Sequence, residues 1–251
     1  MFATDLFSGE NGIVCISGAS RGLGKGLAIM FAERGAHVVV APWDQAELVV
    51  AQTELAAKGL KMETVASDVS DPRACEQLVV HTVNLFGRID TMICNVGIDT
   101  IKAAEDYENG EWDRILDVNL KGAYFCARYA GRAMLAEGKG SIIIGVANRR
   151  QLRHSRAYAL RGIDQLVRTK GVEWAQRGVR VNAVAPGYIN NFMDGVDTTS
   201  PSPYQQRAMT RTSMGRRGEI AEFGGYIFLA IAASSYMTEK ILYVDGGCHA
   251  G

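Results

Sequence analysis

Short apolar runs alternate with longer amphipathic runs along this chain, and this alternation limits the possible folds most strongly. Seven runs predict strands, at residues 12–18, 36–41, 61–70 (with a loop), 90–97, 140–147, 180–187 and 240–247. Helical spacing of apolar residues predicts helices over 24–35, 44–59, 72–87, 111–137, 155–177 and 220–233. Such strands favour a parallel sheet with helices on both faces. Right-handed crossovers then predict an α/β, doubly wound sheet in a single domain over residues 1–251.

Composition agrees with one large-cored domain and excludes several functions. Of the 251 residues, 47% are apolar and 22% are charged, and the formal net charge is zero. A neutral chain has no general attraction to nucleic acid or to an anionic membrane. No segment approaches the roughly 18 apolar residues of a membrane span, and the N-terminus does not resemble a signal peptide, so we expect a cytoplasmic protein.

The five cysteines are scattered and lack the paired spacing of a metal site. Cys15 and Cys94 lie inside apolar strand-like runs. We therefore expect buried, reduced thiols and no bound metal.

A glycine-rich loop, SGASRGLG (Ser17–Gly24), follows the first predicted strand and opens the first predicted helix. Gly18, Gly22 and Gly24 permit a tight turn that brings the helix N-terminus close to a pyrophosphate. Free amide groups and the helix dipole would stabilise the negative charge there. A turn built only for packing is the alternative, but the strand–turn–helix context favours a Rossmann-type dinucleotide site.

The glycine spacing Gly-x-x-x-Gly-x-Gly resembles that of the short-chain dehydrogenase/reductase family. The resemblance continues in order through five further motifs, which are SDV (67–69), CNVG (94–97), DVNLKGAYF (117–125), RVNAVAPGYI (180–189) and YVDGG (243–247). In that family the first two of these lie at the adenine and beside the cofactor. The asparagine of the third has a structural and proton-relay role, which implies that role for Asn119. The fourth forms the nicotinamide-side loop.

The loop and the resemblance together predict a nicotinamide cofactor. The predicted cofactor-binding residues are Gly18, Ser20, Arg21, Gly22, Leu23, Gly24, Trp43, Asp68, Val69, Asn95, Gly97, Pro186, Gly187 and Ile189. Selection of NAD(H) usually requires an acidic residue directly after the second strand, and here the chain reads Ala41-Pro42-Trp43-Asp44. Arg21 could pair with a 2′-phosphate. NADP(H) is therefore favoured over NAD(H), unless Asp44 reaches back to the ribose.

The family's acid/base machinery is missing at its expected positions. The resemblance implies a tyrosine that exchanges the substrate proton, a lysine one helical turn later that lowers its pKa, and a serine from the fifth strand. Counted back without gaps from Pro186-Gly187, the tyrosine position is Arg156 and the lysine position is Leu160. The serine position falls within residues 145–147, which read Gly-Val-Ala. Arginine stays protonated and cannot replace the tyrosine.

Tyr158 and Arg161 form the nearest substitute pair. A two-residue deletion would bring Tyr158 to the tyrosine position and leave Gly162 at that of the lysine, with Arg161 supplying positive charge. Halohydrin dehalogenases are similar in pairing tyrosine with arginine, although they lack the glycine loop. The catalytic prediction is thus Asn119, Tyr158 and Arg161. Tyr158 as a packing or subunit-contact residue is the alternative.

Two further segments bear on the substrate. The run 148–161 carries five arginines and His154, and by resemblance it crosses the substrate mouth. These arginines could bind a carboxylate or phosphate, or they could form a solvated loop, and His154 could transfer a proton. The polar tract 190–217 resembles the family's substrate lid, with a plain surface loop as the alternative.

Three functions remain open at this point. The first is an NADP(H)-linked oxidoreductase for a small carbonyl or alcohol, possibly anionic, with a non-standard site. The second is a non-redox enzyme on the same scaffold, namely a cyclase, dehydratase, isomerase or lyase. The third is a non-catalytic dinucleotide-binding protein. The family resemblance also implies a homo-oligomer, formed through the helices near 111–137 and 155–177.

Overall fold

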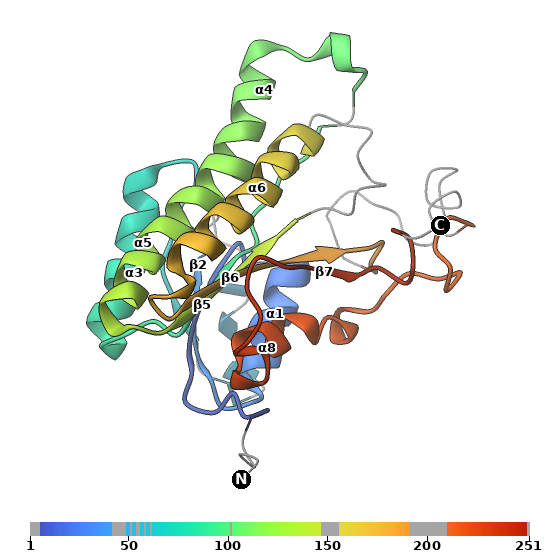
Figure 1. Ribbon diagram of the computed structural model, residues 1–251. Coiled ribbons are helices and arrows are strands. Elements are labelled where there is room, and N and C mark those ends of the chain that lie inside the picture. The colour runs from blue at the N-terminus through green and yellow to red at the C-terminus, as the bar shows by residue number, and fades with distance from the viewer. Residues whose placement is uncertain are drawn as a thin grey trace.

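The computed structural model describes residues 6–41, 49–50, 52–53, 56–57, 59–60, 62–100, 102–146, 156–190 and 210–249. Its centre is a seven-stranded sheet in the order β3-β2-β1-β4-β5-β6-β7, with every pair parallel (Figure 1). The strands are β1 (Ile13–Ser17), β2 (His37–Ala41), β3 (Met62–Thr64), β4 (Thr91–Cys94), β5 (Gly140–Gly145), β6 (Val179–Pro186) and β7 (Ile241–Val244). The predicted doubly wound α/β fold is confirmed.

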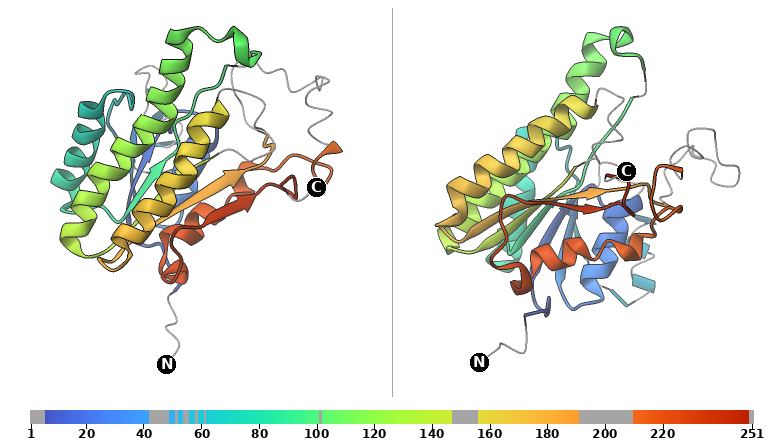
Figure 2. Two further views of the ribbon diagram at one scale, coloured as in Figure 1. Left: turned by 45° about the horizontal axis from the view of Figure 1, so that its top comes forward. Right: turned by 45° about the vertical axis from the view of Figure 1, so that its right-hand side comes forward.

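Helices cover both faces of this sheet. They are α1 (Gly22–Ala32), α3 (Pro72–Phe86), α4 (Asn109–Leu116), α5 (Ala123–Glu137), α6 (Arg156–Ala175) and α8 (Gly225–Ala230). Figure 2 shows α3, α5 and α6 on one face and α1 and α8 on the other. Two buried clusters fill these layers, and β1 contributes to both, because successive side chains of a strand point to opposite faces. Cys15 belongs to the cluster under α3 and α5, whereas Val14 and Ile16 belong to the cluster under α1 and α8.

Local sequence explains where α3 begins and ends. The Asp71 side chain accepts a hydrogen bond from the Arg73 amide at 2.9 Å, and Pro72 occupies the first helical position. The helix ends at Gly87, which has a φ of 77°. Leu78 and Val79 face the core between these ends, so capping and amphipathicity specify the same element.

Three predicted elements differ from the observed ones. The helix predicted over 111–137 begins at Asn109 and is divided by a π-helical turn, η2 (Asp117–Gly122). The helix predicted over 220–233 is α8 between two 3₁₀ turns, η4 (Ile220–Glu222) and η5 (Ala232–Ser234), because Ile231 has extended dihedral angles. The third predicted strand is only Met62–Thr64. Within 44–59, residues 49–50, 52–53 and 56–57 are described, and they are helical.

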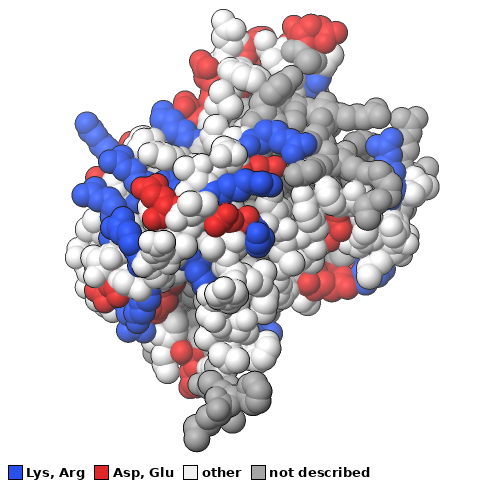
Figure 3. All heavy atoms as spheres, in the orientation of Figure 1, with Lys and Arg blue, Asp and Glu red and all other residues white. Residues whose placement is uncertain are grey.

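The surface carries no continuous patch of one charge on the face seen in Figure 3, where acidic and basic side chains are interspersed. Among the described residues, no helix combines the length and the apolar character needed to cross a membrane.

Candidate functional site

The predicted cofactor loop lies where the sheet changes direction. β1 lies between β2 and β4, so the chain that leaves β1 builds one half of the sheet through β2 and β3 and then crosses over to β4. The carboxyl ends of β1 and β4 are adjacent, with Ser17 opposite Cys94. Ligands of open α/β sheets bind in the crevice at such a switch point.

The loop after β1 is folded so tightly that its glycines admit no side chain. Gly18 has a φ of 68°, and a Cβ atom there would lie 3.1 Å from the Val96 Cα atom. A Cβ atom at Gly24 would lie 2.1 Å from the Gly18 carbonyl oxygen. Gly22, where α1 begins, has a φ of 56°, which is unfavourable for other residues. The loop is therefore built for close approach of the backbone.

Asn95 fixes this loop to the end of β4. Its Nδ2 atom donates to the Gly18 carbonyl at 2.8 Å, and its backbone amide donates to the Ser17 hydroxyl at 3.1 Å. The Gly18 amide donates to the Ala41 carbonyl at 2.8 Å, at the end of β2. Three strand ends are thus joined around Gly18, and the loop is held in one conformation before any ligand arrives.

The N-terminus of α1 lies directly after this loop. Arg21 is the N-cap residue and is exposed, and it makes no side-chain hydrogen bond to the helix start. The first amides of a helix have no partner within the helix, and they attract anions. Ser20 and Arg21 directly precede these amides in the chain. The Leu23 side chain, by contrast, is 8% exposed and packs in the α1 and α8 core, so only its backbone faces the loop.

The predicted adenine-side turn lies beyond β3. The exposed Asp68 accepts hydrogen bonds from the Ser70 amide at 2.9 Å and the Ser70 hydroxyl at 2.8 Å. Val69 is buried against Gly122, where a Cβ atom would lie 3.0 Å from the Val69 carbonyl oxygen. A cleft of about 380 Å³ borders this turn and is lined mainly by Asp68, Ser70, Asp113, Arg114 and Asp117.

Asn119 lies in the π-helical turn η2 and is 3% exposed. Its Oδ1 atom accepts from the Ile98 amide at 2.8 Å, and its Nδ2 atom donates to the Ile98 carbonyl at 2.9 Å. The side chain therefore binds the segment after β4 as another strand would. The structure gives Asn119 a structural contact with the chain just beyond Asn95 and Gly97.

The predicted nicotinamide-side residues lie at the end of β6. A Cβ atom at Gly187 would lie 2.6 Å from the Asp245 Cα atom, so Gly187 permits close contact with the chain after β7. Ile189 forms a bridge with Gly218. A second cleft, of about 320 Å³, opens at this end of the sheet and is lined in part by Tyr188, Val244 and Asp245. Met214 and Arg216, from the predicted lid tract 190–217, also line this cleft.

The predicted catalytic positions are brought together only in part. Gly145 ends β5, and Val146 is buried in the core, so neither supplies a hydroxyl group. Arg161 is about half exposed, and its guanidinium contacts Asp164 at 3.3 Å. The side chains of Arg156, Tyr158 and Leu160, together with Trp43 and residues 147–155, lie outside the described parts of the chain.

The direction of Arg161 follows from the faces of α6. Ala159, Ile163 and Val167 are buried and share one face, while a helix turns by about 100° per residue. Arg161 projects from the opposite side. Gly162 packs on Leu120 of η2, where a Cβ atom would lie 2.8 Å from Leu120 Cδ2. The structure therefore places Arg161 on the exposed side of α6, in contact with Asp164.

Fold and loop together define a nucleotide-binding α/β protein of the Rossmann type. A family model described as enoyl-(acyl carrier protein) reductase matches residues 18–249. The (2S)-[(R)-hydroxy(phenyl)methyl]succinyl-CoA dehydrogenase subunit BbsD of Thauera aromatica is 32% identical over 246 residues, which are 95% of this chain and 96% of that protein. The chain therefore belongs to the short-chain dehydrogenase/reductase family, and these relatives are named as dehydrogenases or reductases.

Solved structures agree with this assignment. A short-chain type dehydrogenase/reductase from Mycobacterium marinum has a TM-score of 0.90 and 32% identity, and the match covers 98% of this chain and 99% of that one. A gluconate 5-dehydrogenase from Burkholderia cenocepacia, solved in complex with NADP and tartrate, has a TM-score of 0.89 and 27% identity, with 98% of each chain covered.

Proposed function

We propose that the chain is an NADP(H)-linked oxidoreductase acting on a small, anionic carbonyl or alcohol substrate through a non-standard active site. One observation carries this proposal, namely the interlocked loop in which Gly24 closes on the Gly18 carbonyl and Asn95 holds that carbonyl. A loop whose glycines allow close approach of the backbone at the N-terminus of a helix fits a pyrophosphate.

The proposed cofactor contacts follow from where these residues lie around the carboxyl ends of the strands. The amides of Gly22, Leu23 and Gly24 bind the pyrophosphate, and the turn at Asp68 and Val69 borders the adenine. Gly97, Pro186, Gly187 and Ile189 border the nicotinamide. Bound NADP(H) supplies or accepts the hydride. Arg21 is exposed beside the loop and is the proposed 2′-phosphate contact, and the complex of the Burkholderia relative with NADP supports this choice.

Proton transfer to or from the substrate needs a polar side chain near the predicted substrate mouth. Asn119, Tyr158 and Arg161 remain the proposed polar residues, with Tyr158 as the proton donor or acceptor. His154 is the next candidate, because its pKa suits transfer near neutral pH. The arginines of 148–161 are the proposed binding groups for the anionic part of the substrate, a role that the tartrate bound by the Burkholderia relative supports.

A second candidate function rests on a specific observation. Residues 145–147, where the family's serine would be expected, read Gly-Val-Ala, and Val146 is buried. Leu160 occupies the ungapped lysine position. A protein that binds the dinucleotide but transfers no hydride to an external substrate would tolerate both residues. This candidate covers a non-redox enzyme and a binding protein.

The experiment that separates these functions is hydride transfer. NADPH oxidation and NADP⁺ reduction are followed by the absorbance of the reduced nicotinamide, with a panel of small keto acids, hydroxy acids, ketones and alcohols. We expect turnover with anionic members of the panel, and Tyr158→Phe should reduce kcat by about 10²-fold or more. His154→Gln is the parallel variant. Cofactor binding without turnover across the panel would favour the second candidate.

We also propose a homo-oligomer in a cytoplasmic setting. Tyr124 of α5 is 39% exposed and Val172 of α6 is 63% exposed, and both lie on helices that the resemblance places at a subunit contact. The five cysteines are free and buried, which suits a reducing compartment. Sedimentation velocity should give a mass at least twice the 27.2 kDa of the chain, and Val172→Asp should shift the particle toward the monomer.

A further inference from the structure

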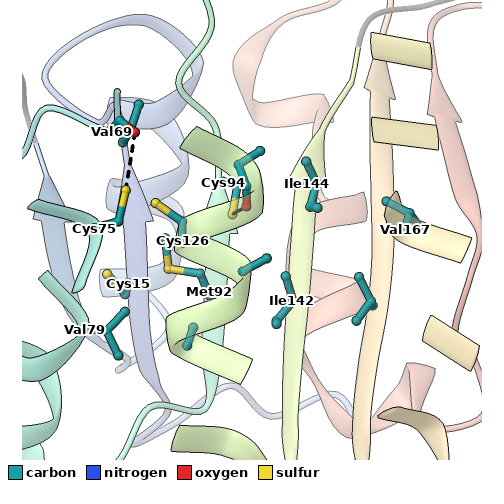
Figure 4. Packing of buried hydrophobic residues seen from close by; sticks show 14 of the residues in the cluster. Cys15, Val69, Cys75, Val79, Met92, Cys94, Cys126, Ile142, Ile144 and Val167 are labelled. Carbon is teal, nitrogen blue, oxygen red and sulfur yellow. Dashed lines mark hydrogen bonds between the residues drawn. The ribbon is translucent and has the colours of Figure 1, made fainter. Parts of the chain in front are cut away.

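Four cysteine thiols gather beneath the adenine-side turn. Cys15 of β1, Cys75 of α3, Cys94 of β4 and Cys126 of α5 belong to one buried cluster, each at most 4% exposed. Figure 4 shows their sulfur atoms around Met92, between the sheet and the helices α3 and α5. They are far apart in the sequence, so only the fold brings them together.

Within this cluster, the Cys75 and Cys126 thiols are neighbours from two different helices, α3 and α5. The Cys75 thiol donates to the Val69 carbonyl at 3.4 Å, and it is also within hydrogen-bonding reach of the Cys126 thiol (Figure 4). Cys126 is in turn within reach of Cys94, which donates to the Ala123 carbonyl at 3.7 Å. Two helices on one face of the sheet are thus connected through adjacent sulfur atoms.

These contacts end on the backbone that forms the candidate nucleotide site. The Val69 carbonyl, which Cys75 contacts, packs against Gly122 at the end of η2. Cys94 directly precedes Asn95, which holds the Gly18 carbonyl. A covalent change at the sulfur cluster would therefore be transmitted to the adenine-side turn, because the turn's own carbonyl is one of the partners.

We propose that Cys75 and Cys126 are a redox-modification site. A disulfide joins α3 to α5 when the Val69 turn opens, and a bound dinucleotide suppresses this reaction by holding the turn closed. Suppression by a bound dinucleotide rests on the proposed function, whereas formation of the disulfide depends only on the positions of the two thiols. Neither residue has a role in the proposed hydride transfer.

The chemistry requires an oxidant, and a low-molecular-weight disulfide such as oxidised glutathione is sufficient. One cysteine thiolate attacks a glutathione sulfur, which forms a mixed disulfide and releases one glutathione thiol. The second cysteine thiolate attacks the mixed disulfide at the protein sulfur, forms the Cys75–Cys126 bond and releases the second glutathione. The protein loses two electrons and two protons, and the two glutathione thiols receive them.

The closed structure protects the pair from this reaction. The hydrogen bond with Cys126, followed by burial, raises the pKa of the Cys75 thiol well above its ordinary value. The thiolate is the nucleophile, so a neutral buried thiol reacts slowly. Reaction then proceeds through local opening, whose population depends on how firmly the covering segment is held.

The test is oxidation of the full chain by oxidised glutathione, with intact mass and peptide mapping as the readouts. We expect two of the five thiols to be lost, and a peptide linked through Cys75 and Cys126. Cys75→Ser and Cys126→Ser should each prevent the linked product, and Cys75→Ala is the second variant should serine disturb folding. Cys248→Ser, at a buried thiol in the C-terminal segment, should leave the linkage intact. Any other pairing, or persistence of the two-thiol loss in Cys75→Ser, would overturn the site.

The second part of the test asks whether bound NADPH suppresses the oxidation. At a concentration about 100 times its Kd, binding should slow the oxidation about 100-fold, because it reduces the open population by that factor. Cys15, in the central strand β1, should remain a free thiol throughout and thereby exclude global unfolding. Oxidation that proceeds at the same rate with bound NADPH would refute the proposed suppression by the dinucleotide. If the reduced protein bound no NADPH but still formed the disulfide, the proposed function would fail while the redox site would stand.

Discussion

Three residues that touch one another decide whether the loop can approach a pyrophosphate. Gly18 takes a left-handed conformation against Val96, Gly24 closes on the Gly18 carbonyl, and Asn95 donates to that same carbonyl. Each contact involves backbone atoms or the partly buried Asn95 amide, so there is little freedom to accommodate a larger group. The site therefore requires that Gly18 and Gly24 carry no Cβ atom.

Gly24→Ala tests this directly. The new methyl group would lie 2.1 Å from the Gly18 carbonyl oxygen and 2.6 Å from Asn95 Nδ2. We expect a loss of about 1–3 kcal/mol in the free energy of unfolding and at least a tenfold weaker binding of NADPH, measured by urea unfolding and fluorescence titration. The matched control is Gly224→Ala, where no atom lies within 4 Å. Equal affinities in the two variants would remove the loop from the binding site.

The sequence motifs identified the participants at this scale but not their contacts. The spacing of Gly18, Gly22 and Gly24 after an apolar strand sufficed to locate the loop. Asn95 was predicted beside the cofactor, but its hydrogen bond to Gly18 depends on β4 lying next to β1, which residues 77 positions apart do not reveal. Likewise, the scattered cysteines gave no sign that four of them share one cluster.

The helical periodicity of the sequence predicted where the helices lie but not where they are interrupted. The run over 111–137 is amphipathic throughout, and a π-helical turn of six residues does not disturb such a pattern. Asn119 provides the reason for the turn, because its amide pairs with both backbone groups of Ile98. Single π-helical turns often mark functional segments, and here the turn joins the start of α5 to the chain after β4.

Asn119→Ala should destabilise the fold through this connection. Two backbone groups at Ile98 would lose their partner, at a cost of about 1–3 kcal/mol for each buried group. Urea unfolding should therefore show a loss of about 2–4 kcal/mol. Gln165→Ala, which removes an exposed contact with Thr169, should change stability by less than about 0.5 kcal/mol. Equal effects of the two substitutions would contradict the structural role of Asn119.

The turn η4 should respond to acid. Hydrogen bonds from Arg216, then from the Glu219 backbone, lower the pKa of Glu222 from its usual 4.5 to about 2. Because the folded pKa lies below the unfolded one, ionised Glu222 contributes stability above about pH 4.5, and this contribution is lost as the pH falls toward 2.

Glu222→Gln should therefore lower the Tm at pH 6 and have less effect near pH 3, measured by differential scanning fluorimetry in constant salt. The size will be modest because the pair is exposed. Glu76→Gln, at an exposed position of α3, is the control. A Tm difference between wild type and Glu222→Gln that is constant from pH 6 to pH 3 would show that the ion pair contributes nothing.

At the scale of the whole molecule, dinucleotide binding and acid/base chemistry depend on different parts of the chain. The glycine loop, the strand order and the family match all agree on a dinucleotide-binding sheet. The acid/base half is a proposal, and Arg161, one of its residues, contacts Asp164 on the exposed side of α6. A chain that kept the dinucleotide-binding loop and changed the acid/base residues would still bind the cofactor, whichever reaction it catalysed.

Direct titration of the purified protein with NADPH and with NADH, by fluorescence and calorimetry, therefore tests the central claim. The account predicts saturable binding of one NADPH per chain, with NADPH at least about tenfold tighter than NADH, or about 1.4 kcal/mol. Arg21→Ala should remove most of that preference. Absence of saturable binding by either nucleotide would contradict the account at its foundation.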